Sequence, residues 1–221
     1  MTAQRTPLSG QHGISLLVVM VMLLLCSLLA LGAARVGWLN EAMVGNLSDD
    51  QRAFLAAEVL MRDAQLDIQS PGNRPITNGS ELFYPLDAAA DFTLLQNRVA
   101  GQSVPCRAGL CFPDTLNTLN GTGTTNWWQQ GDAVVNAMRA AGATYGQITG
   151  VARDPSQESP LLTPTGDRLA HYWIEAFLLP PNQVTMAGAV SQDRPFAYRV
   201  TVVVDGLKGG TRVVLQSIMS P

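Results

Sequence analysis

Three cysteines could carry redox chemistry in this chain, and their positions separate them into two kinds. Cys106 and Cys111 lie close together in a polar segment that contains Gly and Pro, whereas Cys26 lies inside a long apolar run. If the C-terminal part is exported, Cys106 and Cys111 should form a disulfide, because extracytoplasmic compartments preserve such bonds. Two free thiols are the alternative. We interpret Cys26 as buried apolar filler, since Leu25 precedes it where lipoprotein processing requires a small residue.

Histidines are too few for a recognisable catalytic or metal site. His12 lies near the N-terminus, and His171 stands beside Tyr172 and Trp173, where a structural role is the simpler interpretation. Catalysis needs a nucleophile with a base, paired tuned carboxylates or a metal cluster. The sequence also lacks a phosphate-cradling glycine loop and the Cys/His spacing of a metal site. We therefore expect no enzyme activity, no cofactor and no metal site.

Paired aspartates are the candidate calcium ligands. The pairs are Asp49 with Asp50 and Asp87 with Asp91. Two carboxylates without an oxygen-rich loop are a weak signal for Ca²⁺. We interpret these residues as solvated charges.

Two adjacent tryptophans form a further motif. Trp127 and Trp128 precede Gln129 and Gln130, a composition that suits a sugar-binding or surface-binding patch. Adjacent tryptophans more often lie one in the core and one at its rim, and we favour that interpretation.

Composition indicates a single domain with an apolar extension. Hydrophobic residues make up 47% of the 221 residues and charged residues 14%, which is apolar for a soluble protein. The net charge of -3 offers no broad basic surface to neutralise phosphates, so we expect no nucleic-acid partner.

The apolar excess is concentrated near the N-terminus. Residues 14–34 contain no charge, and they are preceded by Arg5 and His12 and followed by Arg35. As a helix this run would span about 32 Å, enough to cross a membrane. The apolar region of a secretory signal peptide is usually shorter. Small residues near the end of the run could imitate a signal-peptidase site, so ordinary cleavage is an alternative.

The helical pattern continues past Arg35, since no proline occurs before Ser70. Apolar residues recur at alternating spacings of three and four, interrupted by Asp50, and this predicts one helical face. They are Leu39, Met43, Leu47, Phe54, Ala57, Met61, Ala64 and Ile68. We predict one helix from about Ile14 to Ile68, which ends at the Ser-Pro-Gly-Asn turn that follows.

The C-terminal part is predicted to contain loops, two short helices and three strands. The helices are expected at 87–99 and 127–141, the second with Trp128, Val135 and Met138 on its buried side. The strands are expected at 170–179, 196–204 and 211–218, and the last two flank a Gly-rich turn typical of a hairpin.

An antiparallel sheet packed on the second half of the long helix follows from these elements. The helical stripe from Phe54 to Ile68 would be buried against the sheet, and each large apolar side chain would contribute about 1.5 to 3 kcal/mol. We therefore predict an α+β fold with long loops.

Several stretches of this sequence resemble those of type IV pilins. A short polar leader that ends in Gly13, followed by an apolar helix, is similar to the class III signal of type IV pilins and pseudopilins. The later stretches resemble PilX-type minor pilins. The sequences concerned are QHGISLL at 11–17, MVGNL at 43–47, AFLAAE at 53–58, MRDA at 61–64, FAYRVT at 196–201 and VVLQS at 213–217.

The resemblance implies processing at one bond. A prepilin peptidase would cut after Gly13 and methylate the new amine of Ile14. Most pilins then carry a glutamate at the fifth mature position, where it attracts the N-terminal amine of a neighbouring subunit, but this chain has Val18. A subunit with nothing in front of it does not need that carboxylate. Val18 therefore indicates a place at or near the pilus tip; tolerance of valine within the family is the alternative.

Four segments follow from the resemblance and the patterns together. They are a leader at 1–13, a transmembrane or filament-core helix at 14–35, the amphipathic half of the helix at 36–70, and a globular extracytoplasmic pilin domain at 71–221. Filament packing is expected to use Val18, Leu39, Met43, Leu47, Phe54, Ala57 and Met61.

The implied function is type IV pilus assembly. The protein would reside in the inner membrane with a periplasmic domain and then enter the pilus. Its partners would be the prepilin peptidase, other minor pilins, the major pilin and a tip adhesin. The alternatives are a surface adhesin at the pilus tip, a pseudopilin of a type II secretion system, and a membrane-anchored enzyme.

Overall fold

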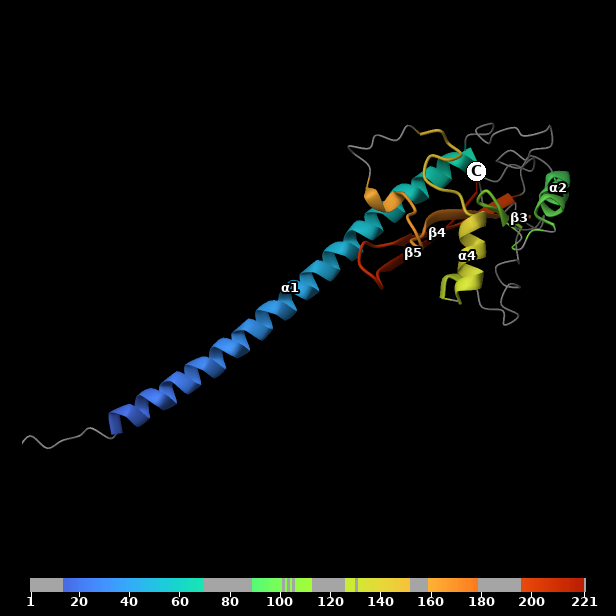
Figure 1. Cartoon of the computed structure of the whole chain (residues 1–221). Coiled ribbons are helices and arrows are strands. Elements are labelled where there is room, and N and C mark those ends of the chain that lie inside the picture. Colours follow the sequence, from blue (N-terminus) through green and yellow to red (C-terminus); the bar gives the residue numbers. More distant parts are fainter. Residues whose placement is uncertain are drawn as a thin grey trace, which may run out of the picture. The chain divides into compact units, whose positions relative to one another are not determined.

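A computed structural model of the whole chain describes residues 14–69, 89–100, 102, 104, 106–112, 126–129, 131–151, 159–178 and 196–220. The chain divides into two compact units, residues 1–47 and residues 48–221. The first unit contains the N-terminal part of helix α1. The second contains the rest of that helix together with the sheet and the shorter helices (Figure 1).

Helix α1 (Ile14–Gln69) is one uninterrupted element of 56 residues, as the sequence predicts. Proline is absent from it, and its N-terminal portion is long and apolar enough to cross a membrane. Cys26 lies in this portion as a free cysteine and is exposed. Lipid or another helix would have to cover it.

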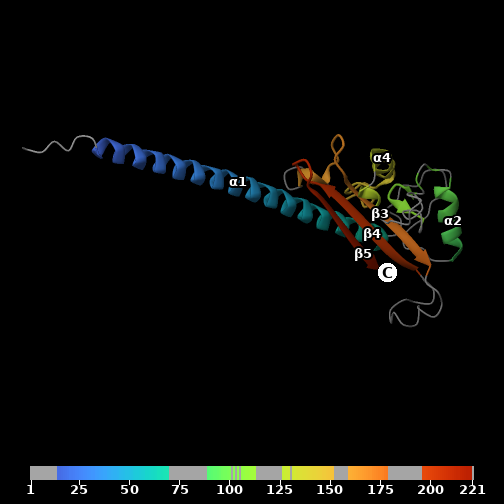
Figure 2. The same ribbon diagram turned by 90° about the horizontal axis from the view of Figure 1, so that it is seen from below.

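The second unit is built on a five-stranded sheet of order β1-β2-β3-β4-β5. The strands are β1 (Cys106–Arg107), β2 (Leu110–Cys111), β3 (Ala170–Leu178), β4 (Phe196–Asp205) and β5 (Arg212–Met219). All neighbours pair antiparallel except β2 with β3, which are parallel. The three long strands lie side by side in Figure 2 and confirm the predicted strands. The two-residue strands β1 and β2 were not predicted.

The shorter helices differ in one respect from the expectation. Helix α2 (Ala89–Val99) lies close to its predicted bounds. The helix expected over 127–141 is divided into a 3-10 turn, η1 (Trp127–Gln129), and helix α4 (Asp132–Ala141). Gly131 has an extended backbone before α4, which separates the two. A further 3-10 turn, η2 (Pro160–Leu162), begins at a Ser159 cap.

The sheet carries a hydrophobic core on each face. One core joins the second half of α1 to alternate residues of β3 and β4, such as Tyr172 and Val202. The other joins Trp173 and Val203, on the opposite face, to Trp127, to Met138 of α4 and to the β1–β2 cysteines. This alternation follows from the period of two in a strand.

The face of α1 that packs on the sheet is displaced from the predicted stripe. Ala57, Met61, Ala64 and Ile68 are buried as predicted, but Phe54 is 42% exposed, so its predicted burial is wrong. Most of the buried apolar side chains on this face are alanines, which a pattern of large apolar residues does not indicate. The buried apolar residues of α1 are Ala53, Ala56, Ala57, Leu60, Met61, Ala64 and Ile68.

Candidate assembly site

The N-terminal end of α1 is the first part of the candidate site. The helix begins at Ile14, the residue predicted to follow the cleavage, while Gly13 lies outside the described residues. The first turn contains no acidic residue, and Val18 is 49% exposed. The helix therefore offers an apolar surface, without a carboxylate, at the position where most pilins carry one.

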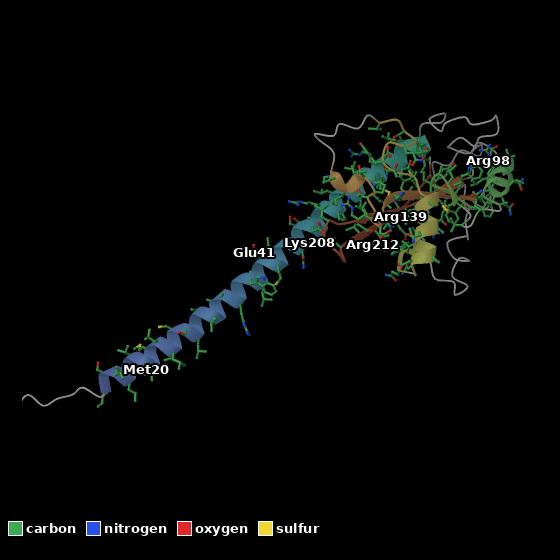
Figure 3. The ribbon with its side chains drawn as sticks, viewed as in Figure 1. Met20, Glu41, Arg98, Arg139, Lys208 and Arg212 are labelled. Atoms are coloured by element: carbon green, nitrogen blue, oxygen red, sulfur yellow. A yellow bond between two sulfur atoms is a disulfide. The ribbon has the colours of Figure 1, made fainter. Side chains whose placement is uncertain are left out.

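The part of α1 in the first unit exposes its apolar side chains, and none of its described residues belongs to a core. From Ile14 to Leu47 no side chain is buried, and the charged residues there are Arg35 and Glu41. Figure 3 shows Met20 and Glu41 on this helix. So many exposed apolar side chains in succession are unfavourable in water and require lipid or neighbouring helices. This segment is suited to a membrane or to packing against other helices.

The predicted filament-packing residues fall into two groups. Val18, Leu39, Met43 and Leu47 are exposed, as is Phe54 in part, and they are available to other subunits. Ala57 and Met61 already pack against the chain's own sheet.

A second exposed stripe on α1 was missed. Leu55, Val59 and Leu66 are between 40% and 59% exposed on the helix face that does not contact the sheet. Their spacings of four and seven were visible in the sequence as a helical face. They form an exposed apolar stripe on the part of α1 that belongs to the second unit.

Asp49 anchors the β4–β5 hairpin to α1. Its carboxylate accepts hydrogen bonds from the backbone N–H groups of Leu207 at 2.9 Å and Lys208 at 3.0 Å. Only 4% of Asp49 is exposed, so its interpretation as a solvated charge is wrong, whereas Asp50 is exposed as expected. A methyl group on Gly206 would come within 2.3 Å of the Asp49 carboxylate, so the turn needs glycine there.

The protonation of Asp49 reflects these contacts. Burial raises the pKa of this carboxyl group, but the N–H groups of Lys208 and Leu207, the Thr211 hydroxyl and the Lys208 charge outweigh burial and lower the pKa below its ordinary value. Asp49 is therefore ionised at neutral pH and holds the hairpin with charge-assisted hydrogen bonds.

Two more aspartates fix α1 to the domain. Asp63 accepts hydrogen bonds from the Gly146 N–H at 2.8 Å and the Thr149 hydroxyl at 2.5 Å. Asp67 accepts one from the Tyr172 hydroxyl at 3.0 Å. All three aspartates lie on the alanine-rich face of α1, and that shared helical phase is the sequence signal that could have revealed them.

The disulfide between Cys106 and Cys111 is present, as predicted. It closes the short β1–β2 hairpin, whose turn residues Ala108 and Gly109 have positive φ angles. The cystine packs in the core that also contains Trp127, which is fully buried. Trp128 is half-buried, so the predicted division into a core residue and a rim residue is correct. Its predicted place on the buried side of a helix is wrong, because Trp128 lies in η1 and not in α4.

His171 is a buried residue of β3, with 5% of its surface exposed. Its Nδ1 atom accepts a hydrogen bond from the Ala170 N–H at 3.3 Å. Burial, together with the positive charge of Arg139, lowers its pKa to about 4, so the ring is neutral at physiological pH. Within the described residues no group of three or more His, Cys, Asp or Glu side chains could hold a metal ion. Asp87 lies outside them, so that aspartate pair is not tested.

These features define a pilin-like α+β protein: a long N-terminal helix, apolar in its first half, that packs its second half on a mostly antiparallel sheet. Residues 12–62 match a family model described as PilX N-terminal. Neither a curated protein nor a solved structure matches the chain. The family match confirms the resemblance to PilX-type minor pilins over this segment and supports a minor pilin role in the type IV pilus.

Proposed function

We propose that this chain takes part in type IV pilus assembly at or near the pilus tip, in a priming complex with other minor pilins. The observation that carries the proposal is the PilX N-terminal match, which covers the Gly13–Ile14 junction and α1 as far as Arg62. The exposed apolar surface from Ile14 to Leu47 supports it, because such a surface needs lipid or other helices around it.

Processing is part of the same proposal. A prepilin peptidase removes residues 1–13, and Ile14 becomes the methylated N-terminus. Residues 14–35 then lie in the inner membrane, residues 36–70 continue the helix, and residues 71–221 form the periplasmic domain. Extraction into the pilus replaces lipid with the helices of the major pilin and other minor pilins, and the tip adhesin binds the assembled complex.

Val18 is the reason for placing the protein at the tip. A glutamate at this position would need the N-terminal amine of another subunit, because a carboxylate in apolar surroundings is tolerated only when it is paired. Valine has no charge, so it neither needs an amine partner nor attracts the N-terminal amine of another subunit. A subunit without the carboxylate can occupy a place where no subunit lies ahead of it.

The test is the location of labelled copies in isolated pili. Gold labelling of an epitope-tagged chain should mark one end of each filament, and deletion of the gene should abolish or strongly reduce pili. Val18→Glu should introduce label along the shaft, whereas Val19→Glu, which adds the same charge one residue away, should not. Regular labelling of shafts by the unsubstituted protein would contradict the tip placement.

A further inference from the structure

A pocket of about 760 Å³ lies in the second unit, and the assembly role proposed above does not use it. Its walls are η1 with Trp128 and Gln129, the loop around Arg168, and the β4–β5 hairpin. Small-molecule pockets in proteins usually measure about 300 to 1,000 Å³. The pocket is therefore large enough for a small ligand.

An ion pair lies among the residues that line the pocket. The Arg212 guanidinium binds both carboxylate oxygens of Asp205, with Nε to Oδ1 at 2.5 Å and Nη2 to Oδ2 at 3.1 Å. Its Nη1 donates to the Trp128 carbonyl oxygen at 2.8 Å, and the Leu169 N–H also donates to Asp205. Figure 3 shows Arg212 and Lys208 on the hairpin. These bonds hold the three walls together, so the pocket is preorganised.

The aromatic wall is held in place by its neighbours. The Trp128 ring meets the buried Trp127 ring edge to face, with centroids 5.7 Å apart, and Trp127 packs in turn on Trp173 at 4.5 Å. Trp128 keeps part of its surface exposed at the pocket, beside the polar side chains of Gln129 and Thr165. A fixed indole beside hydrogen-bonding groups suits a sugar ring, which has apolar C–H faces and a hydroxyl-bearing edge.

The charges favour an anionic ligand. Both carboxylates that line the pocket have a cationic partner, since Asp205 pairs with Arg212 and Asp167 pairs with Arg139 at 3.5 Å. Arg168 instead donates through Nη2 to two carbonyl oxygens and the Thr165 hydroxyl, each at 3.3 Å. Among the described residues Arg168 has no carboxylate partner. Its remaining N–H groups can bind a carboxylate, for which the planar guanidinium is well suited.

We propose that this pocket binds an acidic saccharide, with the sugar ring against Trp128 and the carboxylate on Arg168. A protein segment is a poorer occupant, because binding hot spots fill well-packed apolar pockets, and the lining contributes few large apolar side chains: Trp128, Leu207 and Val214. This inference adds a carbohydrate-binding activity and does not depend on the assembly role.

The test is a titration of the full chain with sialyllactose, with lactose as the matched uncharged sugar. The detergent must lack a sugar headgroup, because a maltoside would compete for the pocket. Tryptophan fluorescence or calorimetry should show saturable binding of sialyllactose that is about tenfold tighter than binding of lactose. Arg168→Gln should remove this preference, and Trp128→Ala should weaken binding of both sugars.

Matched variants away from the pocket serve as controls. Trp38→Ala and Arg52→Gln alter exposed residues of α1 and should leave binding unchanged, while thermal unfolding verifies that each variant is folded. Absence of sialyllactose binding up to about 10 mM would overturn the proposal. So would binding that Arg168→Gln and Trp128→Ala do not change. Loss of copurifying pilins in these variants, without sugar binding, would assign the pocket to a protein partner instead.

Discussion

At the scale of single residues, Asp49 is the most informative side chain of the domain. It joins α1 to a hairpin that follows it by 158 residues in the sequence. Its neighbour Asp50 has the same chemistry but is exposed. The sequence could not distinguish the two, because the difference lies in hairpin N–H groups that only the folded chain brings to Asp49.

Asp49→Ala should destabilise the second unit, since the backbone N–H groups of Leu207 and Lys208 would lose their acceptor. We expect a decrease of about 1 to 3 kcal/mol in the free energy of unfolding. Chemical denaturation of the full chain in detergent measures it. Asp50→Ala is the matched control and should change stability by less than about 0.5 kcal/mol. Equal effects of the two substitutions would contradict the anchoring role.

Asp49 should also contribute to stability in a pH-dependent way. Its pKa is lowered in the folded chain from an ordinary value of 3.8, so the folded state binds its proton less readily than the unfolded state. The contribution is therefore complete above about pH 4 and is lost as the pH falls through the lowered pKa. As the pH falls below 4, the Asp49→Ala variant should therefore lose less stability than the unsubstituted protein.

His171 should give a separate pH dependence at higher pH. Its pKa falls from 6.5 to about 4 on folding, so the unfolded state binds the proton more readily and stability is lost as the pH falls from about 6.5 towards 4. The loss should total roughly 2 to 3 kcal/mol. His171→Gln should flatten this part of the stability profile, measured by thermal unfolding across pH 4 to 7. An unchanged slope would show that another group titrates.

At the scale of elements, the long helix and the long strands were predictable because apolar residues recur in them at regular spacings. The spacing of three and four residues predicted α1 almost to its last residue, and the Gly-rich turn predicted the β4–β5 hairpin. Strands β1 and β2 have two residues each and no period to detect. Phe54 was misplaced because the helix packs through its alanines, and a pattern of large apolar residues does not indicate that face.

The alanine face of α1 should tolerate little added volume. Ala57 is fully buried against the sheet, so Ala57→Leu should cost about 1 to 3 kcal/mol in unfolding free energy through overpacking. Ala42→Leu is the control, because Ala42 is exposed on the same helix and both substitutions place a good helix former. Denaturant titration compares them. A neutral effect at Ala57 would mean that α1 does not pack closely on the sheet.

At the scale of the whole molecule, the two units differ in how their apolar side chains are buried. The described residues of the first have exposed apolar side chains, whereas the second has its own cores, a disulfide and three buried aspartates on α1. A chain organised in this way can exchange lipid for neighbouring helices around its first unit without unfolding its second. The predicted boundaries at residues 35 and 70 differ from this division, and the aspartate contacts and the pocket depend on long-range folding.

We propose that the chain is processed and assembled as a type IV minor pilin. Mass spectrometry of its N-terminal peptide, from cells with and without the prepilin peptidase, is the decisive experiment. We expect a methylated Ile14 at the N-terminus when the peptidase is present and retention of the leader when it is absent. An intact Met1 in both strains, or a cut near Ala34, would contradict it.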